Sequence, residues 1–231
     1  MWSYYGNKSK IIHLYPEPKY DIIIEPFAGT ARYSLRFFRK KVILNDKYDV
    51  IVKIWRWLQS ITMEELLSLP IPLRGQNIKG MNIPQEAKYL YGFLAGRGTE
   101  RPRLTVTEWG SETFRSDLMR IAANLYRIRH WEIRQGEYYE LDNIEATWFI
   151  DPPYQYGGEV YIEHNIDYEH LAEWCMTRKG QVIVCENSKA TWLPFKPLVK
   201  FRGQKHDSEE VIWVNDYEKA DKQLSLFELR V

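Results

Sequence analysis

The chain of 231 residues is 45% hydrophobic and carries a formal net charge of +1 at neutral pH. A chain of this size can bury a substantial core, as one domain with an insertion or as two small domains, and this composition excludes a disordered protein. The nearly neutral charge argues against a protein that holds nucleic acid by overall attraction. Any contact with DNA therefore has to come from a local basic patch.

The two cysteines, Cys175 and Cys185, lie in apolar surroundings without the spacing of metal ligands. Unpaired cysteines are typical of reducing compartments, so we expect a cytoplasmic protein without a metal site. No apolar run approaches the roughly 18 residues of a membrane span, and the N-terminal stretch lacks a signal-peptide core. We therefore expect a soluble protein with no membrane partner.

The first 58 residues predict half of a doubly wound sheet. An apolar strand over 20–25 runs into the glycine turn Phe27-Ala28-Gly29-Thr30-Ala31, and a helix follows over 32–38. Such a turn lets backbone approach a nucleotide-like cofactor closely, and the helix start presents free NH groups. A second strand over 41–44 ends at Asp46, where an acid is placed to accept hydrogen bonds from ribose hydroxyls.

Residues 59–130 interrupt this pattern and predict an inserted, small helical or irregular domain, with a helix over about 113–129. Prolines and glycines punctuate residues 60–112, and no clear strand alternation is left. An arginine cluster with aromatic neighbours suits a DNA backbone and its bases, although a solvated basic face explains the same residues. The candidate DNA contacts are Arg97, Arg101, Arg103, Arg115 and Arg120.

The apolar run 146–150 ends at Asp151-Pro152-Pro153-Tyr154, which predicts a buried strand that opens into a rigid loop. The two prolines fix φ, so the Asp151 carboxylate and the Pro152 carbonyl should keep a fixed mutual geometry. Two fixed acceptors suit one NH2 group, and Tyr154 offers a flat face for stacking a planar ring. A strand-ending turn capped by Asp151 is the simpler alternative.

Further alternation of elements follows to residue 216. We expect a helix near 167–177, a strand over 181–185 and a final strand pair around 198–201 and 211–214. The predicted fold is therefore α/β, with a doubly wound, mostly parallel sheet. We assign residues 1–58 and 131–216 to the catalytic domain, 59–130 to the insertion and 217–231 to a tail.

Three segments carry a resemblance to a known family. In chain order they are Tyr4-Tyr5-Gly6-Asn7-Lys8, the turn at 27–31 and the tetrapeptide at 151–154. Together, and in this order, they resemble an alpha-class, Dam-like DNA adenine N6-methyltransferase. The resemblance covers most of the chain and implies a sheet of the S-adenosylmethionine-dependent methyltransferase type, with the insertion as a short target recognition domain. One departure is Ala31, where the family turn has a second glycine. Alanine does not take positive φ cheaply, so we expect a tighter or altered turn.

The resemblance implies S-adenosylmethionine as cofactor, double-stranded DNA as partner, and a bacterial cell or phage-infected host as the setting. Glu137 falls where the family places an acid that contacts the cofactor adenine. The implied cofactor site comprises Tyr4, Lys8, Phe27, Gly29, Asp46, Glu137 and Asp151, and the implied catalytic residues are Asp151, Pro152 and Tyr154. Without the motifs downstream, a solvated basic arm explains the segment around Lys8 equally well.

Four functions share this pattern. Methyl transfer to adenine N6 after base flipping is the function we expect, because Asp151 and the Pro152 carbonyl can accept both amino hydrogens and leave the nitrogen lone pair free. The same acceptors serve cytosine N4. An RNA or protein methyltransferase would share the fold. A non-catalytic DNA-binding module would need neither Asp46 nor Asp151.

The tail carries an apolar pentapeptide, Gln223-Leu224-Ser225-Leu226-Phe227, after a charged stretch. It resembles the bacterial sliding-clamp binding motif, in which a glutamine anchors the segment and Leu-x-Leu-Phe fills a hydrophobic pocket. Packing of Leu224, Leu226 and Phe227 back on the sheet is an equally good alternative. Docking would be weak, because a mobile tail loses entropy when it binds.

Overall fold

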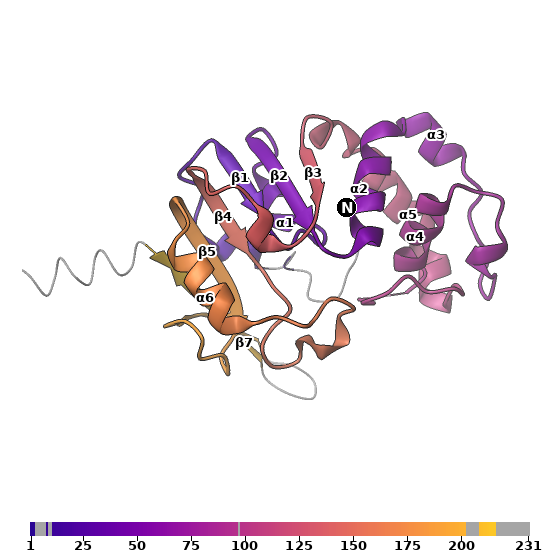
Figure 1. The fold of residues 1–231 in the computed structure, drawn as a ribbon. Helices are drawn as coiled ribbons and strands as arrows, with labels where there is room; N and C mark the ends of the chain where they lie inside the picture. The colour runs from indigo at the N-terminus through magenta and orange to yellow at the C-terminus, as the bar shows by residue number, and fades with distance from the viewer. Residues whose placement is uncertain (3–7, 9–10, 97, 202–207, 216–231) are drawn as a thin grey trace, which may run out of the picture.

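The computed structural model describes residues 1–2, 8, 11–96, 98–201 and 208–215, and Figure 1 shows these as a ribbon. Several predicted residues lie outside the described residues: Tyr4, Arg97 and the proposed clamp-docking residues Gln223, Leu224, Leu226 and Phe227. No helix in the described ranges has both the length and the apolar character needed to cross a membrane.

One seven-stranded sheet, with the order β3-β2-β1-β4-β5-β7-β6, forms the centre of the fold. Strands β3, β2, β1, β4 and β5 pair in parallel, and β7 runs antiparallel to both β5 and β6. This confirms the predicted α/β fold with a mostly parallel sheet. The strands are β1 (Ile22–Glu25), β2 (Lys41–Asp46), β3 (Glu132–Gln135), β4 (Ala146–Ile150), β5 (Gly180–Asn187), β6 (Lys196–Phe201) and β7 (Ser208–Val214).

Helices cover both faces of the sheet, which explains why the central strands are mainly apolar and buried on both faces. All five residues of β4 are buried. On one face, α1 (Arg32–Arg36) and α2 (Asp49–Ser60) contribute Tyr33 and Trp55 to a core with Phe149. On the other face, α6 (Tyr168–Met176) packs Trp174 against Trp148.

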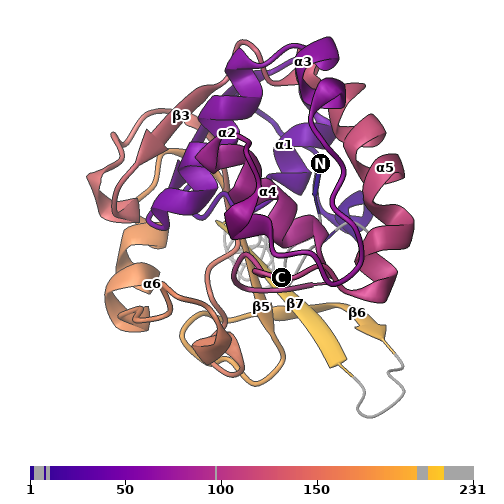
Figure 2. The same cartoon turned by 90° about the vertical axis from the view of Figure 1, so that its right-hand side faces the viewer.

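The insertion is more helical than its composition predicts. It contains α3 (Met63–Ser68), α4 (Gln85–Leu94) and α5 (Glu108–Ala122), gathered beside α2 in Figures 1 and 2. Their core residues, such as Phe93 and Phe114, belong to the same cluster as Trp55. Short 3-10 turns complete the fold at Ile12–Leu14, Ile78–Gly80, Leu125–Arg127, Tyr138–Glu140 and Gly158–Val160.

The helix predicted over 113–129 begins and ends earlier than expected. Thr107 caps its start, because its hydroxyl accepts a hydrogen bond of 3.1 Å from the Gly110 amide. The α-helix ends at Ala122, and the chain continues as the 3-10 turn at Leu125–Arg127. The predicted bounds were therefore shifted toward the C-terminus.

Candidate functional site

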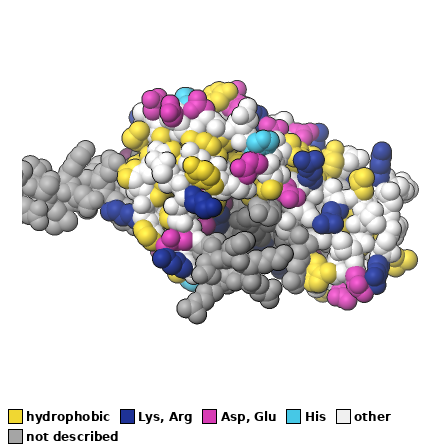
Figure 3. All heavy atoms as spheres, turned by 90° about the horizontal axis from the view of Figure 1, so that it is seen from below, with side chains coloured by type: hydrophobic (Ala, Val, Ile, Leu, Met, Phe, Trp, Pro, Cys, Tyr) yellow, Lys and Arg dark blue, Asp and Glu magenta, His cyan; other side chains and the backbone are white. Residues whose placement is uncertain are grey.

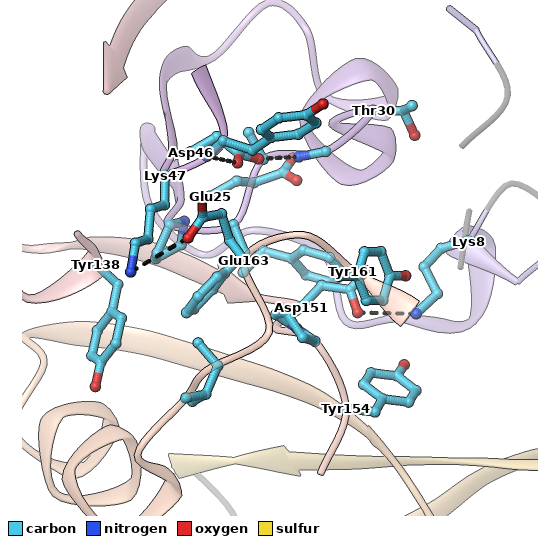
Figure 4. A pocket seen from close by; sticks show the side chains of 18 of the residues that line it. Lys8, Glu25, Thr30, Asp46, Lys47, Tyr138, Asp151, Tyr154, Tyr161 and Glu163 are labelled. Atoms are coloured by element: carbon cyan, nitrogen blue, oxygen red, sulfur yellow. Dashed lines mark hydrogen bonds and ion pairs between the residues drawn. The ribbon is translucent and has the colours of Figure 1, made fainter. Parts of the chain in front are cut away.

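The candidate site is a cavity of about 790 Å³ at the carboxyl edge of the parallel strands. Four acids reach it from strand ends: Glu25 from β1, Asp46 from β2, Asp151 just after β4, and Glu210 from β7. Glu210 stands early in its strand. It reaches this edge because β7 is antiparallel and opposes Asn187, at the end of β5. Figure 4 shows the cavity side chains.

Seven residues predicted for the site lie together in this one cavity: Lys8, Phe27, Gly29, Asp46, Glu137, Asp151 and Tyr154. Pro152 is buried between two lining residues and does not itself line the cavity. The fold thus brings together residues that are more than 100 positions apart, such as Asp46 and Asp151, through the parallel order of β2, β1 and β4.

At one end of the cavity, Asp46 is tied to the glycine turn. Its Oδ2 accepts a hydrogen bond of 2.9 Å from the Gly29 amide, and its Oδ1 accepts one of 2.9 Å from the Tyr48 amide. Burial raises the pKa of Asp46 to about 6, although both amide donors act in the opposite direction. Each carboxylate oxygen has a second lone pair, so Asp46 can accept further hydrogen bonds from a ligand.

The turn itself contains two residues in the left-handed region, Gly29 with φ of 44° and Ala31 with φ of 47°. Ala31 therefore adopts a conformation that favours glycine, at a cost of roughly 1–2 kcal/mol. It is buried and precedes α1. The substitution of alanine for glycine is thus accommodated by local strain, and the left-handed backbone is retained.

An aromatic and charged wall flanks the turn. The rings of Phe27 and Tyr138 lie 5.5 Å apart, and both line the cavity. Glu137 pairs with Lys47 at 2.7 Å, and Lys47 also lies 3.5 Å from Glu163. This wall combines a flat apolar surface with a half-exposed acid, which suits a heteroaromatic ring that carries an amino group.

At the other end of the cavity, Lys8 connects two acids. Its Nζ lies 2.9 Å from Asp151 Oδ1 and 3.5 Å from Glu210 Oε1. Burial works against the charged form of Lys8, but the two carboxylates hold its pKa above the usual value. Burial raises the pKa of Asp151, and the Lys8 ammonium opposes this effect.

Tyr154 is held at both its hydroxyl and its ring. The hydroxyl donates a hydrogen bond of 2.5 Å to Glu210 Oε1, and Lys8 Nζ lies 4.6 Å from the ring centroid. A planar ligand that stacks on Tyr154 therefore shares the ring with Lys8 or displaces it. The contacts with Glu210 and Lys8 therefore restrict the orientation in which the Tyr154 ring can stack on a ligand.

Contacts from neighbouring elements fix the backbone around Tyr154. The Tyr168 hydroxyl donates a hydrogen bond of 2.8 Å to the Pro153 carbonyl. The Gln155 amide donates one of 2.9 Å to Glu186, a buried acid near the end of β5. The loop after β4 is therefore rigid on both sides of Tyr154.

The described candidate DNA contacts lie outside the cavity. Arg101, Arg103, Arg115 and Arg120 are exposed, and Arg120 pairs with Asp117 one turn away on α5. Figure 3 shows basic and acidic side chains interspersed over the helical insertion. The segment that carries Arg101 reaches the cavity rim, because Gly98, three residues before it, lines the cavity.

Sequence reasoning assigned no role to Glu25, Lys47 or Glu210. Glu25 ends β1 as Asp46 ends β2, so the same pattern of an acid after an apolar strand would have identified it. Burial raises its pKa to about 8, and hydrogen bonds from Ser34 act in the opposite direction. Among the described residues, no group of three or more potential ligands could hold a metal ion.

No protein-family model matches the sequence, and no curated protein matches it. Among solved structures, a conserved hypothetical protein from Streptococcus pyogenes matches at 12% identity and a TM-score of 0.34, over 84% of this chain and 85% of the other. A putative methyltransferase, yhhF from Escherichia coli, matches at 8% identity and a TM-score of 0.32, over 89% of this chain and 78% of the other. Because these TM-scores are low, we assign the fold from the strand order and infer the function from the residues of the cavity.

Proposed function

We propose that the protein transfers a methyl group from S-adenosylmethionine to N6 of adenine in double-stranded DNA, after base flipping. The observation that carries this proposal is that Asp151 and the turn at Gly29 and Asp46 face one common cavity. A donor held at the turn and an amino group held at Asp151 would therefore meet in a single enclosed space. That proximity is what a direct transfer between two bound molecules requires.

The residues at the turn fit the donor. Asp46 offers acceptors to ribose hydroxyls, and the wall of Phe27 and Tyr138 offers a face for the donor's adenine ring, with Glu137 at its edge. Left-handed Gly29 and Ala31 bring bare backbone to the cavity. When bound, S-adenosylmethionine supplies an electrophilic methyl group on a positively charged sulfur.

Asp151 supplies the chemistry at the amino group. Adenine N6 is a poor nucleophile, because its lone pair is delocalised into the ring. If Asp151 accepts one of its hydrogens, and the Pro152 carbonyl, which does not line the cavity, turns to accept the other, the nitrogen can become pyramidal and direct the lone pair at the methyl carbon. The methylated nitrogen would then release one of these hydrogens as a proton to the Asp151 carboxylate. Asp151 has two oxygens, so it can hold Lys8 through Oδ1 and still accept from the substrate through the other.

Base flipping supplies access to the cavity. A base inside a duplex cannot reach Asp151, so it has to be extruded, at a cost of a few kcal/mol that stacking on Tyr154 offsets. Exposed arginines on the insertion, beginning with Arg101 near the rim, are suited to hold the flanking phosphates. Cytosine N4 methylation would use the same acceptors and is an alternative outcome of the test.

The test is to incubate the purified protein with DNA and labelled S-adenosylmethionine, digest the DNA, and identify the methylated nucleoside by mass spectrometry. We expect N6-methyladenine, and we expect Asp151→Ala to abolish it. Glu173→Gln, an exposed position on α6, serves as a matched control. N4-methylcytosine would replace the adenine assignment, and label found only in RNA or protein would refute the DNA assignment.

A further inference from the structure

We propose that Glu210 is a positioning residue, which holds the Tyr154 side chain in one rotamer so that the target base stacks on it productively. This inference rests on the proposed function. It concerns a residue of β7, more than 50 positions beyond the tetrapeptide at 151–154, and it gives the buried start of that strand a role in the reaction.

The contact that carries the inference is the hydrogen bond of 2.5 Å from the Tyr154 hydroxyl to Glu210 Oε1. The two prolines before Tyr154 restrict backbone φ, but they leave the rotation of the Tyr154 side chain free. A bond to the hydroxyl, at the far end of the ring, holds the side chain in one χ1 rotamer. The Lys8 ammonium against the ring face then restricts the turning of the ring about its own axis. Pro152 and Pro153 thus restrict the backbone before Tyr154, and Glu210 restricts its side chain.

Glu210 is itself held rigidly. Its Oε1 also accepts a hydrogen bond of 2.6 Å from the Tyr15 hydroxyl, and Lys8 Nζ lies 3.5 Å away. Tyr15 is buried and packs edge-on against Phe149, next to the end of β4. A side chain anchored from two other elements transmits little motion to Tyr154.

A purely structural role explains Glu210 less well. The following residues of β7, Val211 to Val214, are buried and apolar. An apolar residue would pack at this position too, without the desolvation cost of a carboxylate that is only 8% exposed. A buried acid bonded to the aromatic side chain that directly follows the two prolines is better explained by its effect on that ring.

The test compares Tyr154→Phe, Glu210→Leu and the double variant, with Glu210→Gln as the conservative substitution. Tyr154→Phe keeps the ring and loses only the hydroxyl. We expect Tyr154→Phe to lower kcat on DNA by about tenfold, and Glu210→Leu to lower it by at least as much, because it also removes the contacts with Tyr15 and Lys8. The double variant should lower kcat by little more than Glu210→Leu alone, because both changes break the bond between Tyr154 and Glu210. We expect Glu210→Gln to recover most of the activity, since its amide oxygen still accepts from Tyr154.

Two further measurements separate positioning from general damage. In protein labelled with 3-fluorotyrosine and free of DNA, we expect the fluorine resonance of Tyr154 to shift and broaden in Glu210→Leu, while that of Tyr33 stays in place. With 2-aminopurine at the target base, we expect less quenching of the flipped base in Glu210→Leu and in Tyr154→Phe. Calorimetry should show unchanged affinity for S-adenosylmethionine in Tyr154→Phe.

Multiplicative losses in the double variant, or an unchanged Tyr154 resonance in Glu210→Leu, would overturn the inference. If Glu210→Leu does not fold, Tyr154→Phe decides alone: an unaltered kcat and unaltered quenching would refute the role of the bond. If the wild-type protein transfers no methyl group to DNA, the proposed function fails. The fluorine spectra, recorded without DNA, would still show whether Glu210 orients the ring.

Discussion

The substitution Glu25→Gln is expected to change how the stability of the protein depends on pH. Glu25 is buried at the end of β1 and accepts a hydrogen bond of 2.7 Å from the Ser34 amide. Burial raises its pKa from 4.5 to about 8. The folded state therefore holds a proton that the unfolded state releases between these two pH values, so this group makes the wild-type protein less stable as the pH rises from 4.5 to 8.

The size of the effect follows from the same values. At about 1.4 kcal/mol for each tenfold change in the proton-binding constant, a pKa that rises from 4.5 to about 8 corresponds to on the order of 5 kcal/mol. Glutamine is neutral at every pH and keeps an oxygen for the Ser34 amide. Relative to the wild-type protein, Glu25→Gln should therefore become more stable as the pH rises through this range, and the difference should level off above pH 8.

The assay is urea unfolding of the donor-free proteins at half-unit steps from pH 4.5 to 9. Glu186→Gln is the matched comparison, because burial raises the pKa of Glu186 only to about 6. The difference between that variant and the wild-type protein should level off near pH 6, at on the order of 2 kcal/mol. A difference for Glu25→Gln that does not vary with pH would refute the reasoning.

Three further outcomes are expected. Asp46→Ala should weaken S-adenosylmethionine binding by about 1–3 kcal/mol in calorimetry. The affinity of Asp46→Asn should lie between those of the wild-type protein and Asp46→Ala, because asparagine keeps an acceptor for the Gly29 amide. Unchanged affinity in both variants would remove Asp46 from the site. Tyr154→Ala should lose about 1–3 kcal/mol of base stacking, measured as weaker binding of 2-aminopurine DNA, and equal binding would contradict the stacking role. For the tail, we propose micromolar binding to a sliding clamp, about 8 kcal/mol. The double variant Leu226→Ala and Phe227→Ala should lose this binding and retain methyl transfer on short DNA. If this variant does not fold, the tail is structural.

Four of the parallel strands, β1, β2, β4 and β5, could be predicted because each contains an apolar run that ends at an acid or a turn, whereas the polar β3 does not. Glu25, Asp46 and Asp151 follow that local pattern, and parallel order then brings them to one edge. Glu210 could not be found in this way. Its place in the cavity depends on the reversal of β7, which pairs it with Asn187 and Val199. A local pattern does not encode which way the last strand runs.

The sequence predicts a helix that overlaps α5 but does not predict α3 and α4, because the glycines and prolines of this region indicate breaks. Pro84 instead precedes the first turn of α4, a position where proline is tolerated. Gly92 lies inside α4 because Pro102 packs directly on it: a Cβ at Gly92 would lie 2.5 Å from the Pro102 Cβ. This glycine is required by a tertiary contact, which no periodicity in the helix could have indicated.

The left-handed conformation of Ala31 also determines which sequences this turn can accept. Two conditions set the order of tolerance: glycine removes the conformational cost, whereas any side chain larger than alanine pays that cost and also has to fit a core position that is only 1% exposed. In a library that varies only position 31, glycine and alanine should therefore be recovered ahead of every larger residue. Ala31 then stands one substitution away from a relaxed turn, and related chains would be expected to alternate between alanine and glycine at this position.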